Sequence, residues 1–310
     1  MLMTKSKRVE APLFRDPIYD GASDPTVIWN REEGCYYMFY TQRRSTSVQV
    51  GYSSIHGSAI GVASSTDGTG WLYRGTLPGL DFEPGHNTFW APEILYANGE
   101  YHMYVSYITG IPTNWNYGRK ILHYTADNLW KWKYRGEIPL SSGRVIDACV
   151  YEVEPGTYKM WYKDEAHGSH TFSAVSRDLY HWEVLREEIA DCAHEGPNVF
   201  EFGGVKWMIT DFWNGLGVYR SDDFTNWARC DKALLDVPGT RAGDGALGHH
   251  ADVLVVNGEA YMFYFCHPYE QKKGEEFDGR HALTAIQATR LTTDGCGLYC
   301  NRNEEFEWRL

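Results

Sequence analysis

The chain has 310 residues and a formal net charge of −12, from 29 lysines and arginines against 41 aspartates and glutamates. This acidic balance disfavours nucleic-acid binding, which depends on neutralising phosphates, and no run of about 18 apolar residues is present that could span a membrane. We find no secretory signal at the start of the chain and therefore expect a cytoplasmic protein. Aromatic residues make up 15% of the chain, an excess that both β-strands and sugar-binding surfaces favour.

Five segments of the chain share one pattern and are expected to form aromatic β-hairpins. In each, a small or polar residue is followed three positions later by valine or isoleucine, then by a turn and a second, aromatic strand. The segments begin at Asp24, Ala91, Asp147, Gly196 and His250. Each contains one methionine, and the only methionines outside the pattern are Met1 and Met3. The regularity indicates an internal repeat.

A weaker pattern follows each hairpin, with an apolar strand, a polar turn containing aspartate, and a tryptophan. Its first four copies end at Trp71, Trp132, Trp182 and Trp227, and the fifth is degenerate. Each unit thus predicts four short strands. Five such units, spaced by about 50 residues, predict an all-β five-bladed β-propeller with four-stranded antiparallel blades around a central channel. Because no linker or break in composition interrupts the units, we expect residues 1–310 to form a single domain.

Carboxylates recur at the start of the repeats, where the innermost strand of each blade meets the mouth of the channel. Asp24 and Asp147 are first residues, and Glu195 directly precedes Gly196. Like charges at a narrow mouth repel one another, so a functional reason is expected for keeping them. Glycoside hydrolysis needs one carboxyl group to protonate the leaving oxygen and another to activate water or attack the sugar. We predict Glu195 as general acid, Asp24 as general base and Asp147 as the pKa modulator of the acid.

The same residues resemble the motifs of glycoside hydrolase family 43, the five-bladed propellers of the arabinofuranosidase, xylosidase and arabinanase group. The matching motifs, in the family's order, are Asp24-Pro25, Trp90-Ala91-Pro92-Glu93, Ile146-Asp147, Glu195-Gly196-Pro197 and Gly248-His249-His250. The resemblance covers roughly the whole chain. It implies that Asp24, Asp147 and Glu195 are the base, modulator and acid of an inverting reaction, in which the base and acid carboxyls lie about 6.5–9.5 Å apart.

Further substrate-binding residues are expected around these carboxylates. The resemblance implies that Arg241 contacts the sugar and the acidic residues, and that Glu93 belongs to the substrate site. We expect Trp90 to form a wall on which a sugar ring stacks. His86 and Trp213 lie at expected blade junctions and are further candidates. For each of them, a purely structural or surface role is the alternative.

The channel is also the expected place for a metal ion. The resemblance implies that His250 lies near a calcium or sodium ion bound in the channel of relatives. A single histidine does not make a site for a hard cation, which prefers several oxygen ligands, so a hydrogen-bonded histidine is the alternative. No cofactor is expected to be required for catalysis.

We expect an inverting, exo-acting hydrolase that removes a terminal pentose, foremost α-L-arabinofuranose, from plant-derived oligosaccharides. A β-D-xylosidase is the first alternative, since pocket shape rather than the acid pair selects the sugar. A retaining fructosidase-like enzyme would use Asp24 as nucleophile. A phosphorylase would need basic residues beside the acid, for which Arg241 and the Arg43-Arg44 pair are the candidates. A non-catalytic carbohydrate-binding propeller would have no need for the three carboxylates together. An oligosaccharide is the expected partner, without nucleic acid or membrane, and the oligomeric state stays open.

Overall fold

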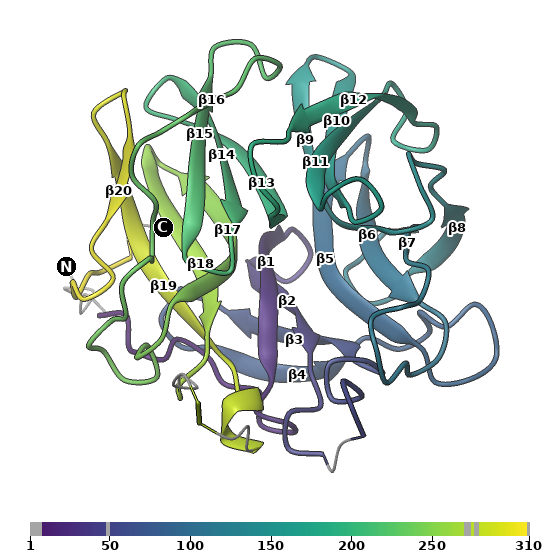
Figure 1. Cartoon of the computed structure of the whole chain (residues 1–310), viewed down its shortest axis with the longest axis horizontal. Helices are drawn as coiled ribbons and strands as arrows, with labels where there is room; N and C mark the ends of the chain where they lie inside the picture. The colour runs from purple at the N-terminus through teal and green to yellow at the C-terminus, as the bar shows by residue number, and fades with distance from the viewer. Residues whose placement is uncertain (1–7, 48–49, 270–273, 276–278, 309–310) are drawn as a thin grey trace.

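The computed structural model describes residues 8–47, 50–269, 274–275 and 279–308 of the chain. Within these ranges its strands form five separate four-stranded antiparallel sheets, which stand around a common centre as the blades of a propeller (Figure 1). This confirms the predicted five-bladed β-propeller. A short 3₁₀ helix covers Gly279–Ala282, and no helix in the described ranges is long and apolar enough to cross a membrane.

Each blade takes four strands that follow one another in the chain and pair in that order. Blade one contains β1 (Ala22–Asn30), β2 (Cys35–Gln42), β3 (Ala59–Ser65) and β4 (Leu72–Thr76). Blade two contains β5 (Thr88–Ala97), β6 (Glu100–Ile108), β7 (Lys120–Ala126) and β8 (Lys133–Glu137). Blade three contains β9 (Val145–Glu154), β10 (Thr157–Asp164), β11 (His170–Ser176) and β12 (Glu183–Ile189). Blade four contains β13 (Glu195–Phe202), β14 (Val205–Asp211), β15 (Leu216–Ser221) and β16 (Ala228–Arg229). Blade five contains β17 (Gly248–Val256), β18 (Glu259–Cys266), β19 (Ala285–Thr293) and β20 (Leu298–Cys300).

The hydrophobic core lies between the blades rather than in one central mass. Five clusters of buried side chains each join two neighbouring blades around the ring. The repeated methionines lie on the second strand of each blade, and all five are completely buried: Met38, Met103, Met160, Met208 and Met262. Flexible, polarisable methionine side chains fill the irregular gaps between twisted sheets, which explains why this residue recurs.

The repeated polar turn before each tryptophan has a structural cause. In three blades an aspartate carboxylate accepts hydrogen bonds from the backbone N–H groups two and three residues later, at Asp67, Asp178 and Asp223. The indole N–H groups of Trp71 and Trp182 donate to backbone carbonyls of the same turns. These Asx-type turns connect the third and fourth strands and account for the aspartate and tryptophan of the second pattern.

The innermost strand of every blade has a β-bulge at the first position of the repeat. The backbone angle φ is positive at four of these five residues, with 48° at Asp24, 42° at Ala91, 59° at Asp147 and 56° at Gly196. A bulge bends the strand and changes the direction of its side chains. A positive φ at a non-glycine residue is strained and persists where the surroundings impose it, often at functional sites. The five bulges therefore determine where the first residues of the repeats point.

Candidate active site

A pocket of about 80 Å³ lies at the mouth of the channel and receives residues from all five blades. Five of the residues predicted from the sequence line it together: Asp24, Trp90, Asp147, Glu195 and His250. The other lining residues are Arg43, Ile55, Trp115, Ile146 and Glu165. The bulged first positions thus bring carboxylates from three blades into one small space.

The Asp24 carboxylate is buried beside a cation. Its Oδ1 atom lies 3.5 Å from Nη2 of Arg43 and 3.7 Å from Nδ1 of His250, and its Oδ2 atom accepts a hydrogen bond of 3.2 Å from the Ser23 hydroxyl. The Arg43 guanidinium also lies over the ring of Phe265, 4.7 Å from its centroid. The ion pair and the hydrogen bond fix the orientation of the carboxylate that is predicted to be the general base.

The Asp147 carboxyl group is buried and holds its proton strongly. Burial, together with the negative charges of Glu195 and Asp24, raises the pKa of Asp147 to about 7. Its Oδ2 atom accepts a hydrogen bond of 3.1 Å from the backbone N–H of Gly196. Near neutral pH, Asp147 is therefore the carboxyl group of the pocket that stores a proton.

The surroundings of Glu195 change its pKa in the opposite direction. Burial by itself would raise the pKa of Glu195, but the ion pair and hydrogen bond with Lys163 lower it to about 2. The Lys163 ammonium group lies 2.9 Å from Oε2 of Glu195, and only 4% of the lysine side chain is exposed. The indole of Trp213 lowers the pKa of Glu195 further. The predicted acid is thus ionised in the free protein.

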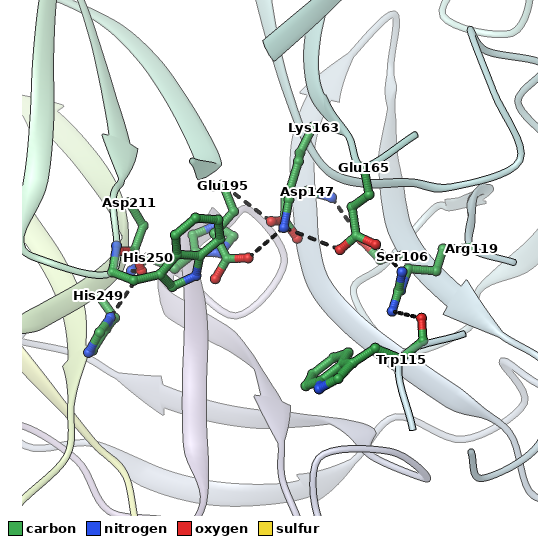
Figure 2. Close-up of polar contacts among 12 residues, drawn as sticks. Ser106, Trp115, Arg119, Asp147, Lys163, Glu165, Glu195, Asp211, His249 and His250 are labelled. Carbon is green, nitrogen blue, oxygen red and sulfur yellow. Dashed lines mark hydrogen bonds and ion pairs between the residues drawn. The ribbon is translucent and has the colours of Figure 1, made fainter. Parts of the chain in front are cut away.

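Lys163 belongs to a charged wall on one side of the pocket (Figure 2). Its ammonium group also lies 3.2 Å from Oε1 of Glu165, whose other oxygen forms ion pairs with Arg119 and Arg144. Both arginines donate to the backbone carbonyl of Trp115, at 3.0 and 3.2 Å. We define Lys163, Glu165, Arg119 and Arg144 as the ionic wall. It links the loop between β6 and β7 to the end of β10.

A recurring contact between neighbouring blades holds the bulged residues in place. The third residue after the repeated methionine, on the second strand of a blade, accepts a hydrogen bond from the backbone N–H of the first residue in the next blade. We call these contacts inter-blade clamps, and they join Thr41 to Ala91 (2.8 Å), Ser106 to Asp147 (2.9 Å) and Asp211 to His250 (3.0 Å). At the junction of blades three and four the same position is Lys163, which has no acceptor atom to offer.

Aromatic side chains form the other side of the pocket. The Trp90 indole N–H donates to the backbone carbonyl of Ile55 at 2.8 Å, which fixes the ring. The ring centroids of Trp90 and Trp115 are 6.1 Å apart, and His56 packs against both. A fixed indole beside carboxylates offers an apolar surface for the C–H face of a sugar.

Four of the predicted substrate-binding residues lie outside the residues that line this pocket. Trp213 is 45% exposed and stays next to the site, with its ring centroid 5.0 Å from the Lys163 ammonium. His86 is exposed and contacts the backbone carbonyl of Gly57. The Arg241 guanidinium donates to the carbonyl of Val9 at 2.7 Å, so it fastens the N-terminal segment. Arg43, rather than Arg241, supplies the arginine beside the acids.

Glu93 lies deeper in the channel, two positions after Ala91. It lines a second cavity of about 260 Å³ together with Thr26, Asn198 and Asp252, which occupy the equivalent position of their blades. The Glu93 carboxyl accepts a hydrogen bond from the backbone N–H of Val150 at 2.8 Å. Burial and the charge of Asp252 raise the pKa of Glu93 to about 8.

A cation in the channel would find better ligands in this second cavity than at His250. Burial would lower the pKa of His250, but the carboxylates of Asp147, Asp24 and Glu195 raise it, which favours the protonated ring, and that form does not ligate a metal. In the second cavity, Glu93 and Asp252 offer carboxylate oxygens. Oδ1 of Asn198 is buried and has no hydrogen-bond partner among the described residues. Oxygen donors of this kind suit a hard cation such as Ca²⁺.

His250 instead explains why the motif requires a glycine. A Cβ atom on Gly196 would lie 2.8 Å from Cγ of the His250 ring, and the φ of this residue is positive. No larger residue fits there without displacing the histidine. Glu195-Gly196 therefore places the acid next to His250 by close approach of the backbone.

Sequence reasoning missed Lys163, Glu165 and Trp115, and it named Arg43 only as a candidate phosphate-binding residue of a phosphorylase. The repeat register contains a signal for one of them, because Lys163 aligns with Thr41, Ser106 and Asp211, and a lysine departs from those acceptor side chains. Glu165 follows the end of β10, and Arg43 and Trp115 lie in loops, where periodicity gives no position.

Comparison with family models matches residues 14–296 to the glycosyl hydrolases family 43. No curated protein matches the chain. Among solved structures, it is similar to a thermostable family-43 glycoside hydrolase, with a TM-score of 0.71 and 19% identity over 96% of this chain and 99% of that one.

Two further structures show the same fold with different named activities. One is a GH43 β-xylosidase/α-arabinofuranosidase from a compost microbial metagenome, in complex with xylotriose and in a calcium-free form, at a TM-score of 0.68 and 14% identity over 94% of this chain and 98% of that one. The other is a GH43 β-1,3-galactosidase with galactodeoxynojirimycin, at a TM-score of 0.67 and 14% identity over 94% and 97% of the two chains. Because the family model spans nearly the whole chain and its motifs meet in one pocket, the protein belongs to glycosyl hydrolase family 43 and is a glycoside hydrolase.

Proposed function

We propose that the protein is an inverting, exo-acting glycosidase that removes one terminal pentose, foremost α-L-arabinofuranose, from an oligosaccharide. The observation that carries this proposal is the small pocket of about 80 Å³ lined by Asp24, Asp147, Glu195 and Trp90. Pockets for larger ligands span about 300–1,000 Å³, so this one suits a single sugar ring at a chain end.

The roles of the carboxyl groups follow from their surroundings. Asp24, beside Arg43, takes the proton of the attacking water. Glu195 gives a proton to the leaving glycosidic oxygen. Asp147 stores the proton that Glu195 needs, and once Asp147 has given it up, the negative charge of Asp147 favours the protonated form of Glu195, since two adjacent carboxylates share one proton more easily than they both ionise. Trp90 and Trp115 offer the surface on which the sugar stacks.

The contacts of the basic residues support hydrolysis over phosphorolysis. Arg43 contacts Asp24, Lys163 contacts Glu195, and Arg119 contacts Glu165, so each positive charge near the pocket already has a carboxylate partner. A phosphate ion would have to compete with these acids. The presence of all three carboxyl groups in one pocket likewise favours an enzyme over a carbohydrate-binding module.

A β-D-xylosidase is the second candidate. Xylose is also a pentose, and the names of the similar structures include both xylosidase and arabinofuranosidase activities. Discrimination between the two sugars depends on hydroxyl contacts at the pocket wall, where Glu165 and Arg43 are the polar side chains beside the catalytic acids.

The oxygen atoms that line the second cavity would bind a cation and take no part in the transfer of protons. A hard cation would be held by Glu93, Asn198 and Asp252, and when bound it would favour the ionised form of the two carboxyl groups below the pocket.

A screen of aryl glycosides tests the proposal. We expect hydrolysis of the α-L-arabinofuranoside, less of the β-D-xyloside, and little of the β-D-galactofuranoside and β-D-fructofuranoside. Proton NMR of the first product should show the anomer opposite to that of the substrate. Retention of the anomeric configuration would overturn inversion, and preference for a hexose glycoside would overturn the pentose assignment.

A further inference from the structure

Lys163 differs from its counterparts in the other blades in both partner and charge. The three clamp residues accept a hydrogen bond from the backbone of the next blade, whereas the buried Lys163 ammonium group lies 2.9 Å from the Glu195 carboxylate. The Gly196 N–H, left without a clamp, donates to Asp147 at 3.1 Å. One residue change therefore connects the predicted acid, its modulator and the ionic wall.

We propose that Lys163 is a positioning residue for the acid step: its ammonium group holds the carboxylate of Glu195 at the pocket and keeps the acid proton on Asp147 until a substrate is bound. The inference rests on the proposed role of Glu195 as general acid. It adds a residue whose charge decides which of two neighbouring carboxyl groups carries the proton.

The proton balance of one turnover is complete with the groups present. The Asp147 carboxyl passes its proton to the Glu195 carboxylate, and Glu195 passes it to the glycosidic oxygen as the bond from that oxygen to the sugar breaks. Water adds to the sugar carbon and gives its proton to Asp24. Afterwards Asp24 releases a proton to solvent, and the pair of Asp147 and Glu195 takes one up.

Glu165 is a second ion-pair partner for the Lys163 ammonium group. The Lys163 ammonium group lies 3.2 Å from Oε1 of Glu165, so weakening its contact with Glu195 does not leave a buried cation without a partner. Arg119 and Arg144 hold Glu165 from the other side. A sugar that fills the pocket excludes water from the carboxyl pair and favours the arrangement with fewer separated charges.

The charged groups that face Glu195 from the surrounding strands set the sign of the expected effects. They are Lys163 on β10, Glu165 after β10, Asp147 on β9, Asp24 on β1, His250 on β17 and Asp211 on β14. Removing the positive charge of Lys163 makes Glu195 harder to ionise. Without the negative charge of Glu165, the Lys163 ammonium group pairs with Glu195 alone, and Glu195 becomes easier to ionise.

Two substitutions with opposite expected shifts test the inference. For Lys163→Met we expect kcat/KM to fall about tenfold and the alkaline limb of its pH profile to move up by about one pH unit or more. For Glu165→Gln we expect the limb to move down by about half a unit. Lys163→Arg keeps the charge and should keep the limb near its original position. Limbs that move in the same direction, or do not move, would overturn the proposal.

A matched control separates this role from stability. Lys159 lies on the same strand, is buried, and pairs with Glu188 at 2.7 Å, away from the pocket lining. Lys159→Met should lower the melting temperature as Lys163→Met does, and leave the pH profile unchanged. If Lys159→Met moves the alkaline limb as far as Lys163→Met, the effect is structural and the inference is wrong.

A direct titration keeps the test independent of the activity. In protein labelled with ¹³C-carboxyl glutamate, the Glu195 resonance is identified by its absence in Glu195→Gln. We expect it to stay in the ionised position above pH 4 in the wild type, and to titrate at least about two pH units higher in Lys163→Met than in the wild type. An unchanged titration overturns the role of Lys163. A shifted titration in a protein that hydrolyses no glycoside would instead overturn the proposed function.

Discussion

The junction between blades three and four differs from the clamped junctions in the contact made by the third residue after the repeated methionine. At the clamped junctions, Thr41, Ser106 and Asp211 accept a backbone N–H and hold a bulge in place. At the junction of blades three and four, Lys163 contacts the side chain of Glu195 and sets its charge. At the junction of blades five and one, the same position is Phe265, which has no acceptor atom. Repetition of a blade thus supplies a ring of rigid, strained positions, and a change at one of them turns a structural contact into an electrostatic one.

The largest effect should follow from removing the acid at this junction. Glu195→Gln keeps the size of the side chain and removes the proton that the leaving oxygen needs, so we expect kcat to fall at least about a hundredfold. Glu201→Gln is the matched control, because Glu201 lies on the same strand and is exposed. It should change kcat less than about twofold. Normal turnover in Glu195→Gln, with a circular dichroism spectrum like that of the wild type, would remove Glu195 from the mechanism.

Asp147→Asn should come next, with an effect on pH dependence. The ionised Asp147 opposes ionisation of Glu195, and its pKa of about 7 makes it the proton store of the pair. Without it, Glu195 loses its proton more easily, so the alkaline limb of kcat/KM should move to lower pH and the rate at pH 7 should fall more than about tenfold. The pH–rate profile measures this directly. A limb that stays in place would contradict the modulator role.

A comparison of two arginines should give a smaller effect. Arg43→Gln removes the cation whose Nη2 lies 3.5 Å from Oδ1 of Asp24, so the base loses its charged partner and we expect kcat/KM to fall about tenfold. Arg241→Gln removes only contacts to the backbone around Val9 and Ala288. It should leave kcat/KM within about twofold and lower the melting temperature slightly. A larger loss of kcat/KM in Arg241→Gln than in Arg43→Gln would instead identify Arg241 as the arginine of the substrate site.

These two arginines show where sequence reasoning succeeds and where it ends. The repeat predicts the five blades, because the buried methionines and the Asx turns recur with fixed spacing. It also predicts which carboxylates meet, since equivalent positions of a ring converge. A loop has no such register, so the position of Arg43 depends on the path of the chain between β2 and β3. Arg241 lies in a loop as well, and its motif position alone does not show that its side chain points to the N-terminal segment.

The side-chain partners of Lys163 could not be predicted for a different reason. Register shows that Lys163 replaces a clamp residue, but the choice between Glu195 and Glu165 depends on the reach of a flexible side chain. The deeper placement of Glu93 follows from the period of two along a strand, which separates it by one layer from Ala91. Motif resemblance places Glu93 near the substrate, whereas strand geometry places it in the second cavity.

Removing either of two inter-blade clamps should have the smallest effect on activity. The pair tests whether a clamp acts on catalysis or only on stability. Ser106→Ala and Thr41→Val each remove the acceptor for one buried N–H group, at Asp147 and at Ala91. An unsatisfied buried donor costs about 1–3 kcal/mol, so both variants should lose a similar free energy of unfolding in urea denaturation. They should differ in activity, because Ser106 supports the bulge that carries Asp147, whereas Thr41 supports a residue without a functional group. We therefore expect kcat to fall several-fold more in Ser106→Ala than in Thr41→Val, and equal losses would show that the clamps act only through the stability of the ring.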